Sequence, residues 1–529
     1  MSSTNVKSNR RRFMRGSALA GAGLLAAASG AQAQDASEEM TFDQETDILV
    51  LGLGLAGLVA AARATELGVR VMAVEKLPNG YWAPGGSFVL SGQLVLQPPK
   101  PYPQTVEAVG IDTVVRSMQW LAGLGIELGG SIQIEGVNQI GEEIEGIPGG
   151  TVFPMKPVAD TSFLWYYLKP GGEFDATQYG GGTAPRVLEQ HIIDNGGTVV
   201  YETAARRLLT NKDGAVIGAQ VVGPDGPYTI GAKAVVLCTG GFALNEEMVS
   251  KYVCSPSRSL VNATQATPGS TGDGLKMALE VGAAASGFGY IYGWPAAIIA
   301  ERTPMHDLSG FLSLDTLSKG IIVLDNGERF ADESLGRNVY GNLMVKEHMT
   351  NTAWYILDAT VYEDTQKVMD KLAMFQEEFG ETLVYQADTL EELATAAGIG
   401  GYLVTQVEEY NQAVDDEAVG RMRVPRTTPY TKLETPPFYA VPFVMGSNKS
   451  FGGPNVDTSA RVLNELDEPI PGLYAAGEVV YNAKVKGVPF WPNDLDHIAA
   501  GAGSGNQEQC LIFGILSVET AVADAGLGE

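Results

Sequence analysis

Two apolar runs with a small-residue stretch between them stand near the start of the chain. Residues 46–51 and 69–74 are short, mostly apolar runs of the length that buried strands have. Residues 58–67, between them, are rich in alanine and predict a helix, which Gly68 ends. The order of strand, helix and strand predicts a βαβ unit in an α/β fold.

A glycine pattern joins the first strand to the helix. Gly52, Gly54 and Gly57 form the sequence G-x-G-x-x-G, and Glu75 directly follows the second strand. In a dinucleotide site the first glycine allows a tight turn, the second lets the backbone approach a pyrophosphate, and the third lets the helix pack on the strand. The start of the helix offers free N–H groups to the phosphates, and Glu75 can accept hydrogen bonds from ribose hydroxyls. The whole arrangement predicts a bound dinucleotide.

Glycine-rich turns recur along the chain. They stand at residues 85–86, after the predicted strand 232–238, and at 472–477 and 501–505. The 65 glycines make up about 12 % of the chain, against roughly 7 % in average proteins. Glycine turns this far apart in sequence indicate one long ligand that distant segments contact together.

The first residues are typical of an export signal. Residues 10–14 resemble a twin-arginine motif, and a small-residue apolar stretch at 16–29 and an A-x-A-like cleavage site at 31–33 follow. An ordinary Sec signal or a basic tail is the alternative. No stretch reaches the roughly 20 apolar residues that span a bilayer. We therefore expect a periplasmic or otherwise exported protein with no membrane span once residues 1–33 are removed.

Charge and composition exclude several other classes of protein. The chain has 35 Lys and Arg against 62 Asp and Glu, a formal net charge of −27, or about −32 without residues 1–33. Nucleic-acid binding needs clustered basic charge, so we expect no nucleic-acid partner. The three cysteines and four histidines are scattered and include no C-x-x-C. We expect no metal site, and cysteines that are buried as small hydrophobic residues.

The chain resembles the fumarate reductase/succinate dehydrogenase-type FAD oxidoreductases, which include periplasmic fumarate and urocanate reductases and 3-ketosteroid dehydrogenases. The matching motifs are D-I-L-V-L-G-L-G-L-A-G from Asp47, V-V-L-C-T-G-G-F from Val235, T-G-D-G-L-K-M-A from Thr271, G-I-I-V-L-D-N-G-E-R-F-A-D-E from Gly320 and G-L-Y-A-A-G-E from Gly472. The resemblance implies a Rossmann-like FAD-binding domain built from two segments, residues 41–288 and 450–529. An inserted α+β capping domain would occupy residues 289–449.

The resemblance also implies the cofactor contacts. We expect non-covalent FAD, with no counterpart of the FMN-attachment and haem domains of some family members. The implied contacts are Gly52, Gly54, Ala56, Gly57, Glu75, Lys76, Gly86, Ser87, Gly240, Asp273, Gly477, Glu478, Ser504, Gly505, Asn506 and Gln507. The last four form a turn whose following helix would face the flavin and stabilise the negative charge of its reduced form. A separate electron-transfer protein would supply the electrons.

The resemblance implies a proton donor at Arg337. In fumarate-type reductases an arginine four residues after an N-E or D-E pair protonates one carbon while the flavin and the neighbouring carbon exchange a hydride. Arg337 stands at that distance from Asp332 and Glu333. Arginine is a very weak acid, so it needs a desolvated site and a carboxylate that returns its proton, for which Glu333 and Asp315 are candidates. A structural ion pair between Arg337 and Glu333 is the alternative.

The dicarboxylate clamp of the fumarate reductases is largely lost. Where they carry His-Pro-Thr this chain has Trp294-Pro295-Ala296, where they carry His-His-Thr-Met-Gly-Gly it has residues 448–453, and the clamp arginine aligns with Gly501. Each lost charge-assisted hydrogen bond costs roughly 1.5–3 kcal/mol, so fumarate is not the expected substrate. Lys449 keeps one positive charge that can hold a carboxylate, phenolate or enone oxygen. A solvated surface lysine is the alternative.

Aromatic residues stand where the clamp is lost. Tyr290, Tyr292 and Trp294 alternate, so in a strand they share one face. Residues 490–491 and 165–167 add aromatic groups in segments that the reductases lack. Flat apolar side chains suit a ring-bearing substrate, with core or lid packing as the alternative.

Three functions follow from these observations. The first is FAD-dependent reduction of an activated C=C bond in a hydrophobic or ring-bearing enone or enoate, with Arg337, Lys449, Glu333, Trp294 and Tyr292 as candidate catalytic residues. The second is a 3-ketosteroid-type dehydrogenase that introduces a C=C bond next to a ketone, with Tyr340 or Tyr292 as base. The third is an electron carrier without an organic substrate. Arg337 stands where the ketosteroid Δ1-dehydrogenases carry a tyrosine, and this favours reduction.

Overall fold

The protein is described from a computed structural model of the full chain. The structure describes residues 40–80, 82–90, 93–96, 109–126, 132–134, 137–139, 142–143, 151–153, 163–167, 183–253, 260–261, 266–297, 319–427, 431–488 and 506–527. The chain divides into a unit of residues 1–41 and a compact unit of residues 42–529, and all elements below belong to the second. The expected export signal lies outside the described residues.

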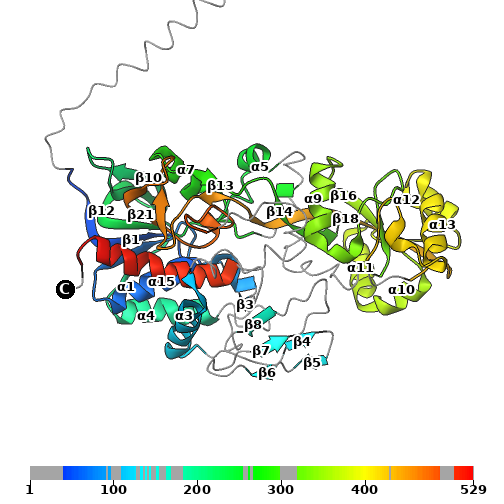
Figure 1. The fold of residues 1–529 in the computed structure, drawn as a ribbon, viewed down its shortest axis with the longest axis horizontal. Helices are drawn as coiled ribbons and strands as arrows, with labels where there is room; N and C mark the ends of the chain where they lie inside the picture. Colours follow the sequence, from blue (N-terminus) through cyan, green and yellow to red (C-terminus); the bar gives the residue numbers. More distant parts are fainter. Residues whose placement is uncertain are drawn as a thin grey trace, which may run out of the picture. The chain divides into compact units, whose positions relative to one another are not determined.

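An eight-stranded sheet forms the first layer of the compact unit (Figure 1). Its strands run in the order β10-β11-β12-β1-β2-β9, with β21 beside β12 and β20 beside β21. Their bounds are β1 Gln44–Leu51, β2 Val71–Val74, β9 Thr198–Val200, β10 Ala204–Thr210, β11 Val216–Gly223, β12 Gly226–Leu237, β20 Arg461–Leu463 and β21 Pro469–Ala475.

The central strands of this sheet are parallel and end in register. Leu51 pairs with Val74 on one side and with Leu237 on the other, and Leu237 pairs with Ala475. The carboxyl ends of four strands therefore meet at one edge, the place where open parallel sheets bind ligands. The strands predicted at 46–51, 69–74 and 232–238 are confirmed. The last begins earlier, at Gly226, because its first half pairs antiparallel with β11.

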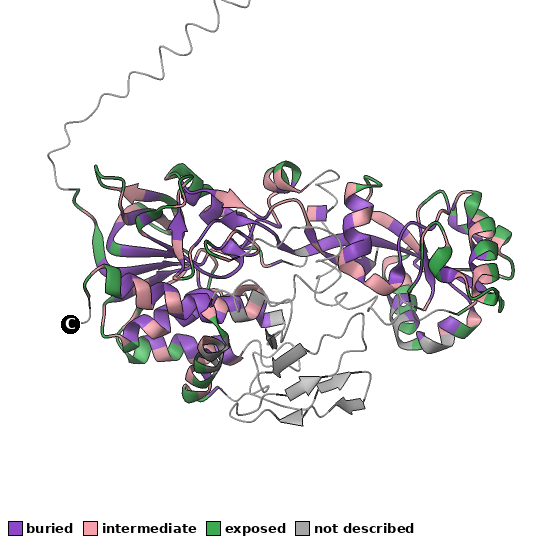
Figure 2. Ribbon diagram, viewed as in Figure 1, coloured by how far each residue is buried: buried purple, intermediate pink, exposed green. Residues whose placement is uncertain are grey.

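Helices cover this sheet and complete its core. The helices are α1 Leu55–Glu66, α3 Ile111–Gly123, α4 Thr183–Asp194, α5 Glu246–Tyr252, α7 Asp273–Glu280 and α15 Asn506–Asp524. The alanine-rich helix predicted at 58–67 is α1, which begins three residues earlier. It packs on α15, where a Cβ on Gly514 would lie 2.9 Å from the carbonyl oxygen of Ala56. Figure 2 shows the buried class gathered on the sheet strands and on the helix faces that contact them.

A second, antiparallel sheet has the order β14-β18-β16-β15, with β17 paired to β18. Its bounds are β14 Ile291–Ala297, β15 Ile321–Val323, β16 Thr352–Leu357, β17 Tyr385–Ala387 and β18 Phe438–Ser450. The helices packed around it are α9 Arg337–Lys346, α10 Ala359–Asp364, α11 Gln366–Phe379, α12 Leu390–Ala397 and α13 Tyr402–Asp415. A separate cluster of buried apolar residues surrounds this sheet. The expected mixed α/β fold is confirmed, and the expected domain boundaries stay predictions.

Smaller elements complete the described part of the chain. A four-stranded sheet contains β3 Gln93–Leu96, β6 Glu142–Glu143, β7 Thr151–Phe153 and β8 Phe163–Tyr167, and two-stranded pairs join β4 Ile132–Ile134 with β5 Val137–Gln139 and β13 Ala285–Ser286 with β19 Gly453–Pro454. The expected aromatic run 165–167 is therefore strand β8. No helix in the described part of the chain is both long and apolar enough to cross a membrane.

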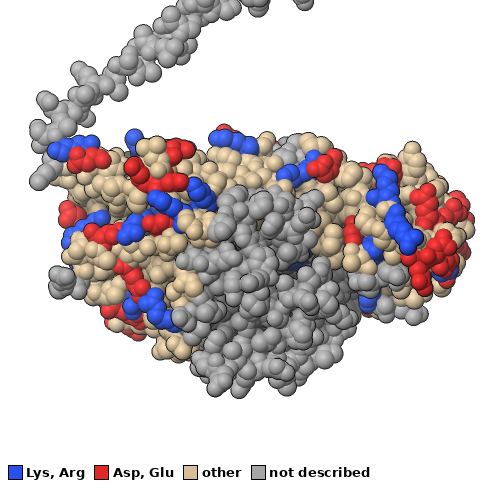
Figure 3. All heavy atoms as spheres, in the orientation of Figure 1, with Lys and Arg blue, Asp and Glu red and all other residues tan. Residues whose placement is uncertain are grey.

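Acidic side chains are dense over one region of the described surface (Figure 3). They gather where α12 and α13 lie, and these helices carry Glu391, Glu392, Glu408 and Glu409. Part of the strongly negative net charge therefore comes from acidic side chains that gather on the helices α12 and α13, next to the second sheet.

Candidate active site

The glycine loop between β1 and α1 has two glycines that the packing requires and one that faces open space. Gly52 has a φ of +97°, and a Cβ there would lie 2.5 Å from the carbonyl oxygen of Cys238. A Cβ on Gly57 would lie 1.9 Å from the carbonyl oxygen of Gly52, so a larger residue would push α1 off the loop. A Cβ on Gly54 would meet no other atom within 4 Å. The loop therefore keeps an open side beside the start of α1, where a pyrophosphate binds in this motif.

Glu75, the expected ribose ligand, is buried directly after β2. Its Oε2 accepts a hydrogen bond from the Leu53 N–H at 2.8 Å, and its Oε1 accepts one from the Leu77 N–H at 2.9 Å. These bonds fix the carboxylate against the glycine loop. Each oxygen keeps a further lone pair, so Glu75 can still accept hydrogen bonds from a ribose.

Two further expected cofactor residues, Lys76 and Asp273, contact each other. The Lys76 Nζ lies 2.7 Å from the Asp273 Oδ2 and 2.5 Å from the Thr271 Oγ1. Asp273 is the first residue of α7, where the helix dipole favours a carboxylate. The ion pair joins the end of β2 to the start of α7, although 197 positions separate the two residues.

The second glycine turn, at Gly86 and Ser87, also lies against the loop. A Cβ on Gly86 would lie 3.3 Å from the Cα of Gly54. The Ser87 Oγ accepts a hydrogen bond from the Thr267 N–H at 3.3 Å. Segments that the sequence identified as separate glycine turns are thus in contact at the carboxyl edge of the sheet.

Glu478 is a buried carboxyl in contact with two other segments. Its Oε1 accepts a hydrogen bond from the Ser450 N–H at 3.1 Å, and the Ser450 Oγ accepts one from the Phe242 N–H at 2.8 Å. A Cβ on Gly241 would lie only 2.3 Å from the Glu478 Oε1. Burial raises the pKa of Glu478 to about 7, although the hydrogen bonds from Ser450 and the charge of Lys449 act in the opposite direction.

The residues at this edge fit FAD. The hydroxyls of Thr239 and Ser270 are buried and have no hydrogen-bond partner within the described ranges, and Gly240, like Gly54, faces open space. Buried hydroxyls are normally hydrogen-bonded, so these two indicate a polar ligand that supplies the partners. Gly477 contacts the glycine-loop helix, since a Cβ on it would lie 2.8 Å from the Ala56 Cβ. Ser504 and Gly505 lie outside the described residues, and Asn506 and Gln507 begin α15 as the expected helix start.

Arg337 is the first residue of α9 and lies against two aromatic rings of β14. Its guanidinium carbon is 3.9 Å from the centre of the Trp294 ring and 5.5 Å from that of Tyr292. One of its terminal nitrogens is 3.5 Å from the Tyr292 hydroxyl, at the long end of the hydrogen-bond range. Gly293, between the two aromatic residues, permits this contact, because a Cβ there would lie 2.6 Å from the Arg337 carbonyl oxygen. Tyr292 and Trp294 thus lie on one strand face as predicted, whereas Tyr290, the third residue of the predicted alternation, lies outside β14.

Lys449 approaches the same tyrosine from β18. Ile291 pairs with Ser450 and Gly293 with Ser447, so the register shifts and two residues of β18 oppose Tyr292. The Lys449 Nζ lies 4.8 Å from the centre of the Tyr292 ring and 5.7 Å from that of Tyr481. Lys449 is only 9 % exposed, so the alternative of a solvated surface lysine is wrong.

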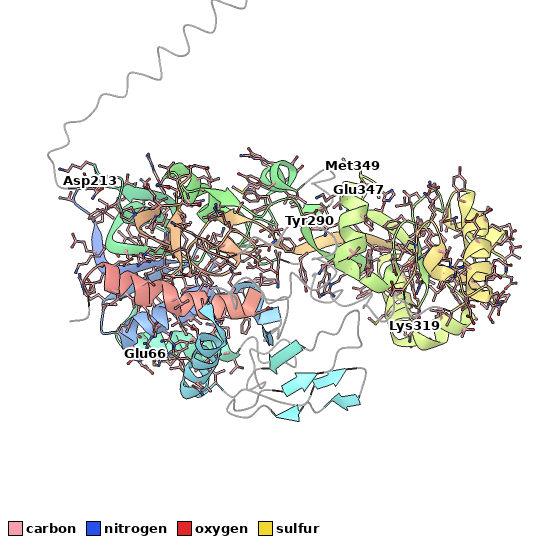
Figure 4. The ribbon with its side chains drawn as sticks, viewed as in Figure 1. Glu66, Asp213, Tyr290, Lys319, Glu347 and Met349 are labelled. Carbon is pink, nitrogen blue, oxygen red and sulfur yellow. The ribbon has the colours of Figure 1, made fainter. Side chains whose placement is uncertain are left out.

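Two cations lower the pKa of Tyr292. Burial alone would raise the pKa of this hydroxyl, but the charges of Arg337 and Lys449 outweigh that effect and bring the pKa below its usual value. Tyr290, labelled in Figure 4, directly precedes β14 and contacts the end of α9, where the Lys346 Nζ lies 3.6 Å from the centre of its ring.

The two cations and the three rings around them are named together below. We call Arg337, Lys449, Tyr292, Trp294 and Tyr481 the aromatic site.

Glu333 does not contact Arg337. It is fully buried, and its carboxylate accepts hydrogen bonds from the Arg329 Nε at 2.9 Å, the Arg329 Nη2 at 2.7 Å and the Arg426 Nη1 at 3.2 Å. The Ile322 N–H donates to the same carboxylate at 2.9 Å. Glu333 was expected to contact Arg337, either as a proton relay or in an ion pair. The structure shows neither contact, because the Glu333 carboxylate is bonded to Arg329 and Arg426. Asp315, the other relay candidate, lies outside the described residues.

Tyr340, a candidate base, is buried inside α9 next to Phe443. Its hydroxyl has no partner within the described ranges, and burial raises its pKa. A base must reach the substrate and ionise, so Tyr340 does not suit that role. Of the cysteines, Cys238 is buried as expected, Cys510 is half-buried and Cys254 lies outside the described residues.

Several residues of these sites were not identified from the sequence. Ser450 and Tyr481 are ordinary residue types with no motif of their own, Thr271 was identified only as the first residue of a matching motif, and Arg426 lies 93 positions from Glu333. Arg329 carried a signal, because it belongs to the G-E-R-F segment directly before Glu333. A buried carboxylate in a motif with an arginine is a reason to test that arginine as its partner.

Comparisons with known proteins add independent findings. A family model described as an FAD binding domain matches residues 47–488. A probable fumarate reductase of Shewanella frigidimarina is 28 % identical over 460 residues, which cover 82 % of this chain and 70 % of the relative. The vinyl phenol reductase of Lactiplantibacillus plantarum is 24 % identical over 498 residues, which cover 84 % of this chain and 92 % of the relative.

A solved structure supports the fold. The 3-ketosteroid-Δ4-(5α)-dehydrogenase of Rhodococcus jostii, in complex with 4-androstene-3,17-dione, aligns with a TM-score of 0.65 and 20 % sequence identity. The alignment covers 92 % of this chain and 99 % of that chain. At this identity the likeness concerns the fold alone.

Proposed function

The chain belongs to the FAD binding domain family and is an FAD-dependent oxidoreductase, and on that premise we propose that it reduces an activated C=C bond in a ring-bearing or otherwise hydrophobic enone or enoate. The observation that carries the proposal is the placement of Arg337. Its guanidinium lies on the Trp294 ring, next to Tyr292, and has no carboxylate partner in the described part of the chain. A cation held in place without a counter-charge is available to a substrate.

The reaction adds one hydride and one proton across the C=C bond. When bound, FAD supplies the hydride, and a separate electron-transfer protein restores the two electrons. Arg337 gives the proton to the neighbouring carbon from its guanidinium. The Trp294 ring fixes the guanidinium plane and keeps water from one of its faces, which favours proton transfer from so weak an acid. Tyr292, 3.5 Å from Arg337, is the described residue best placed to return the proton.

The residues at the carboxyl edge of the first sheet would hold FAD without a covalent bond. Gly52, Gly54 and the start of α1 would take the pyrophosphate, and Glu75 would take a ribose. Contacts with FAD are also supported by three neighbouring residues. Gly240 faces open space. The buried hydroxyls of Thr239 and Ser270 have no hydrogen-bond partner among the described residues. Glu478, next to Ser450, links this edge to the strand that carries Lys449.

A ring-bearing substrate is supported by the aromatic residues and by one relative. Tyr292, Trp294 and Tyr481 surround the two cations, and the loss of the clamp histidines removes partners for a second carboxylate. The name of the vinyl phenol reductase gives a ring-bearing alkene as its substrate, and that relative matches over most of both chains.

The second candidate is the reverse reaction, a dehydrogenase that introduces a C=C bond next to a ketone. The lowered pKa of Tyr292 favours it, because a phenol that ionises more easily is a better base. The arginine next to Tyr292 favours reduction, since a cation beside the reacting carbon assists protonation. The rate of reduction of an unsaturated compound can be compared with the rate of dehydrogenation of its saturated counterpart. Faster reduction would favour the first candidate, and faster dehydrogenation the second.

We also propose the division of the chain that the resemblance implies. Residues 41–288 and 450–529 would form the FAD-binding domain, and residues 289–449 the cap. The pairing of β21 with β12 and the separate sheet of β14 to β18 support this division. The twin-arginine signal in residues 1–33 rests on its sequence pattern, and a basic electron-transfer partner would suit the negative charge.

A direct experiment tests the function. The purified flavoprotein is reduced without oxygen, and reoxidation of the flavin is followed by absorbance with fumarate, urocanate, cinnamate and a 3-ketosteroid in parallel. We expect a ring-bearing acceptor to reoxidise it fastest. Fast reoxidation by fumarate alone would contradict the argument from the lost clamp, and failure of all acceptors would favour an electron carrier.

A further inference from the structure

Lys449 carries a buried positive charge that no described carboxylate pairs with. It is 91 % buried, and no carboxylate in the described ranges lies within ion-pair distance of its ammonium. Its ammonium lies over the faces of two tyrosine rings, 4.8 Å and 5.7 Å from their centres, and its charge also lowers the pKa of the buried Glu478, with which it forms no ion pair. Burial of a lone ammonium is costly, and a ring face compensates for only part of the lost hydration. Among the described residues, therefore, no anion contacts the Lys449 ammonium.

A neutral donor on the same side also lacks a partner. The indole Nε1 of Trp294 is buried and makes no hydrogen bond to any residue that the structure describes. Trp294 and Tyr292 share one face of β14, and Tyr292 contacts both cations. Lys449 and Trp294 thus offer unused N–H donors to a ligand that lies over Tyr292.

The two cations have different tasks. The proposed reaction uses Arg337 as the proton donor, which leaves Lys449 as the cation of the described aromatic site that can hold a charged group. A dicarboxylate would place its second carboxylate among Tyr292, Trp294 and Tyr481, where no further cation is described. A neutral substrate would leave the lysine charge unpaired. One anionic group on an otherwise apolar molecule matches the site.

We propose that Lys449 binds the single carboxylate of the substrate, and that the substrate is a ring-bearing α,β-unsaturated monocarboxylate. The assignment rests on the proposed function. Hydride addition to the β-carbon converts the C=C bond to a single bond and moves an electron pair towards the carboxylate, and the proton from Arg337 then reaches the α-carbon. The Lys449 ammonium stabilises the charge that develops on the carboxylate oxygens. Bound FAD in its reduced form would supply the hydride and become oxidised, and the proposed electron-transfer protein would return the two electrons.

The test compares an acid with its neutral amide. The holoenzyme binds cinnamate or cinnamamide, and the dissociation constant is read from the change in the flavin spectrum and from calorimetry. In Lys449→Gln we expect the constant for cinnamate to rise about 10- to 100-fold, with little change for cinnamamide. Lys449→Arg keeps the charge and should retain most of the preference for the acid.

A matched control is available on the neighbouring ring. Lys346 lies over Tyr290 as Lys449 lies over Tyr292, and Lys346→Gln should change neither constant. Equal weakening of acid and amide in Lys449→Gln, or no weakening, would overturn the assignment. Tighter binding of 4-hydroxystyrene than of cinnamate would assign the lysine to a phenolate and also overturn it.

The two proposals fail in different ways. If reduced wild-type enzyme is reoxidised by neutral enones as fast as by cinnamate, the assignment of Lys449 fails and the C=C reductase stands. If no enone or enoate reoxidises the flavin although cinnamate binds through Lys449, the reductase fails and the anion site stands.

Discussion

Two groups of charged residues in the second sheet and its helices have opposite character. Around Glu333, the two arginines Arg329 and Arg426 share one buried carboxylate, and all three side chains are at most 1 % exposed. In the aromatic site, Arg337 and Lys449 face aromatic rings and have no carboxylate partner in the described residues. We call the first group the paired cluster.

The difference indicates what each group does. A buried charge whose hydrogen bonds are all satisfied has nothing left to offer a ligand, and its removal damages the fold. A fixed cation without a partner costs folding free energy and can act on a substrate. By this reasoning we propose that the motif that includes Asp332 and Glu333 holds the start of α9 in place, and that Arg337, at that start, acts on the substrate.

The largest expected effect is on the rate, from Arg337→Met. Removal of a proton donor lowers turnover by about 10²–10⁴-fold, while the free energy of unfolding should change by less than about 1 kcal/mol because no ion pair is broken. Flavin reoxidation by cinnamate measures the rate, and urea unfolding measures the stability. A variant that keeps FAD and full turnover would show that another group donates the proton.

Glu333→Gln should give the reverse result. It leaves Arg329 and Arg426 without their shared carboxylate, so we expect a loss of about 3–5 kcal/mol in the free energy of unfolding. The turnover of each folded, FAD-loaded molecule should stay within about threefold of the wild type. A large fall in turnover with unchanged stability would place Glu333 in the reaction and break the comparison.

Glu478 is a buried carboxyl with no ion-pair partner among the described residues, so it allows the same comparison of paired and unpaired groups to be made with an acid. Its pKa is raised to about 7 by burial, whereas an unfolded glutamate titrates near 4.5. The folded protein therefore binds more protons between these values, and the free energy of unfolding should fall as the pH rises from about 4.5 to about 7, by up to about 3 kcal/mol. Above pH 7 the slope should vanish. Urea unfolding of the FAD-free protein at pH 5 and pH 8 measures the difference, which Glu478→Gln should remove.

The smallest expected effect comes from Trp294→Phe. The change keeps an aromatic ring beside Arg337 but removes the unpaired indole N–H, so cinnamate should bind about 2- to 10-fold more weakly. Trp354→Phe is the matched control, because the Trp354 Nε1 already donates to the Asp325 Oδ1 at 2.9 Å. Equal effects of the two changes on cinnamate binding would show that the Trp294 N–H has no ligand.

The sequence predicted the glycine loop and its strands because those features depend on local patterns. Gly52, Gly54, Gly57 and Glu75 lie within 24 residues, and the apolar runs around them have the lengths of a βαβ unit. The alternation of Tyr292 and Trp294 likewise gave their shared face correctly, since a strand has a period of two.

The partners of charged residues could not be predicted in the same way. Arg426 reaches Glu333 across 93 positions, and Lys76 reaches Asp273 across 197. Such contacts depend on how the sheets and helices assemble. The same holds for Lys449, which has no ion-pair partner among the described residues, because burial without such a partner is a property of the folded chain and leaves no local pattern.

A crystal structure of the holoenzyme with 3-phenylpropanoate, the saturated and unreactive product of cinnamate, tests the central claim most directly. We predict that the carboxylate lies within hydrogen-bond distance of the Lys449 Nζ, with the ring against Tyr292 or Trp294 and the α-carbon facing Arg337. A product bound elsewhere, or one bound here with its carboxylate directed away from Lys449, would contradict the account.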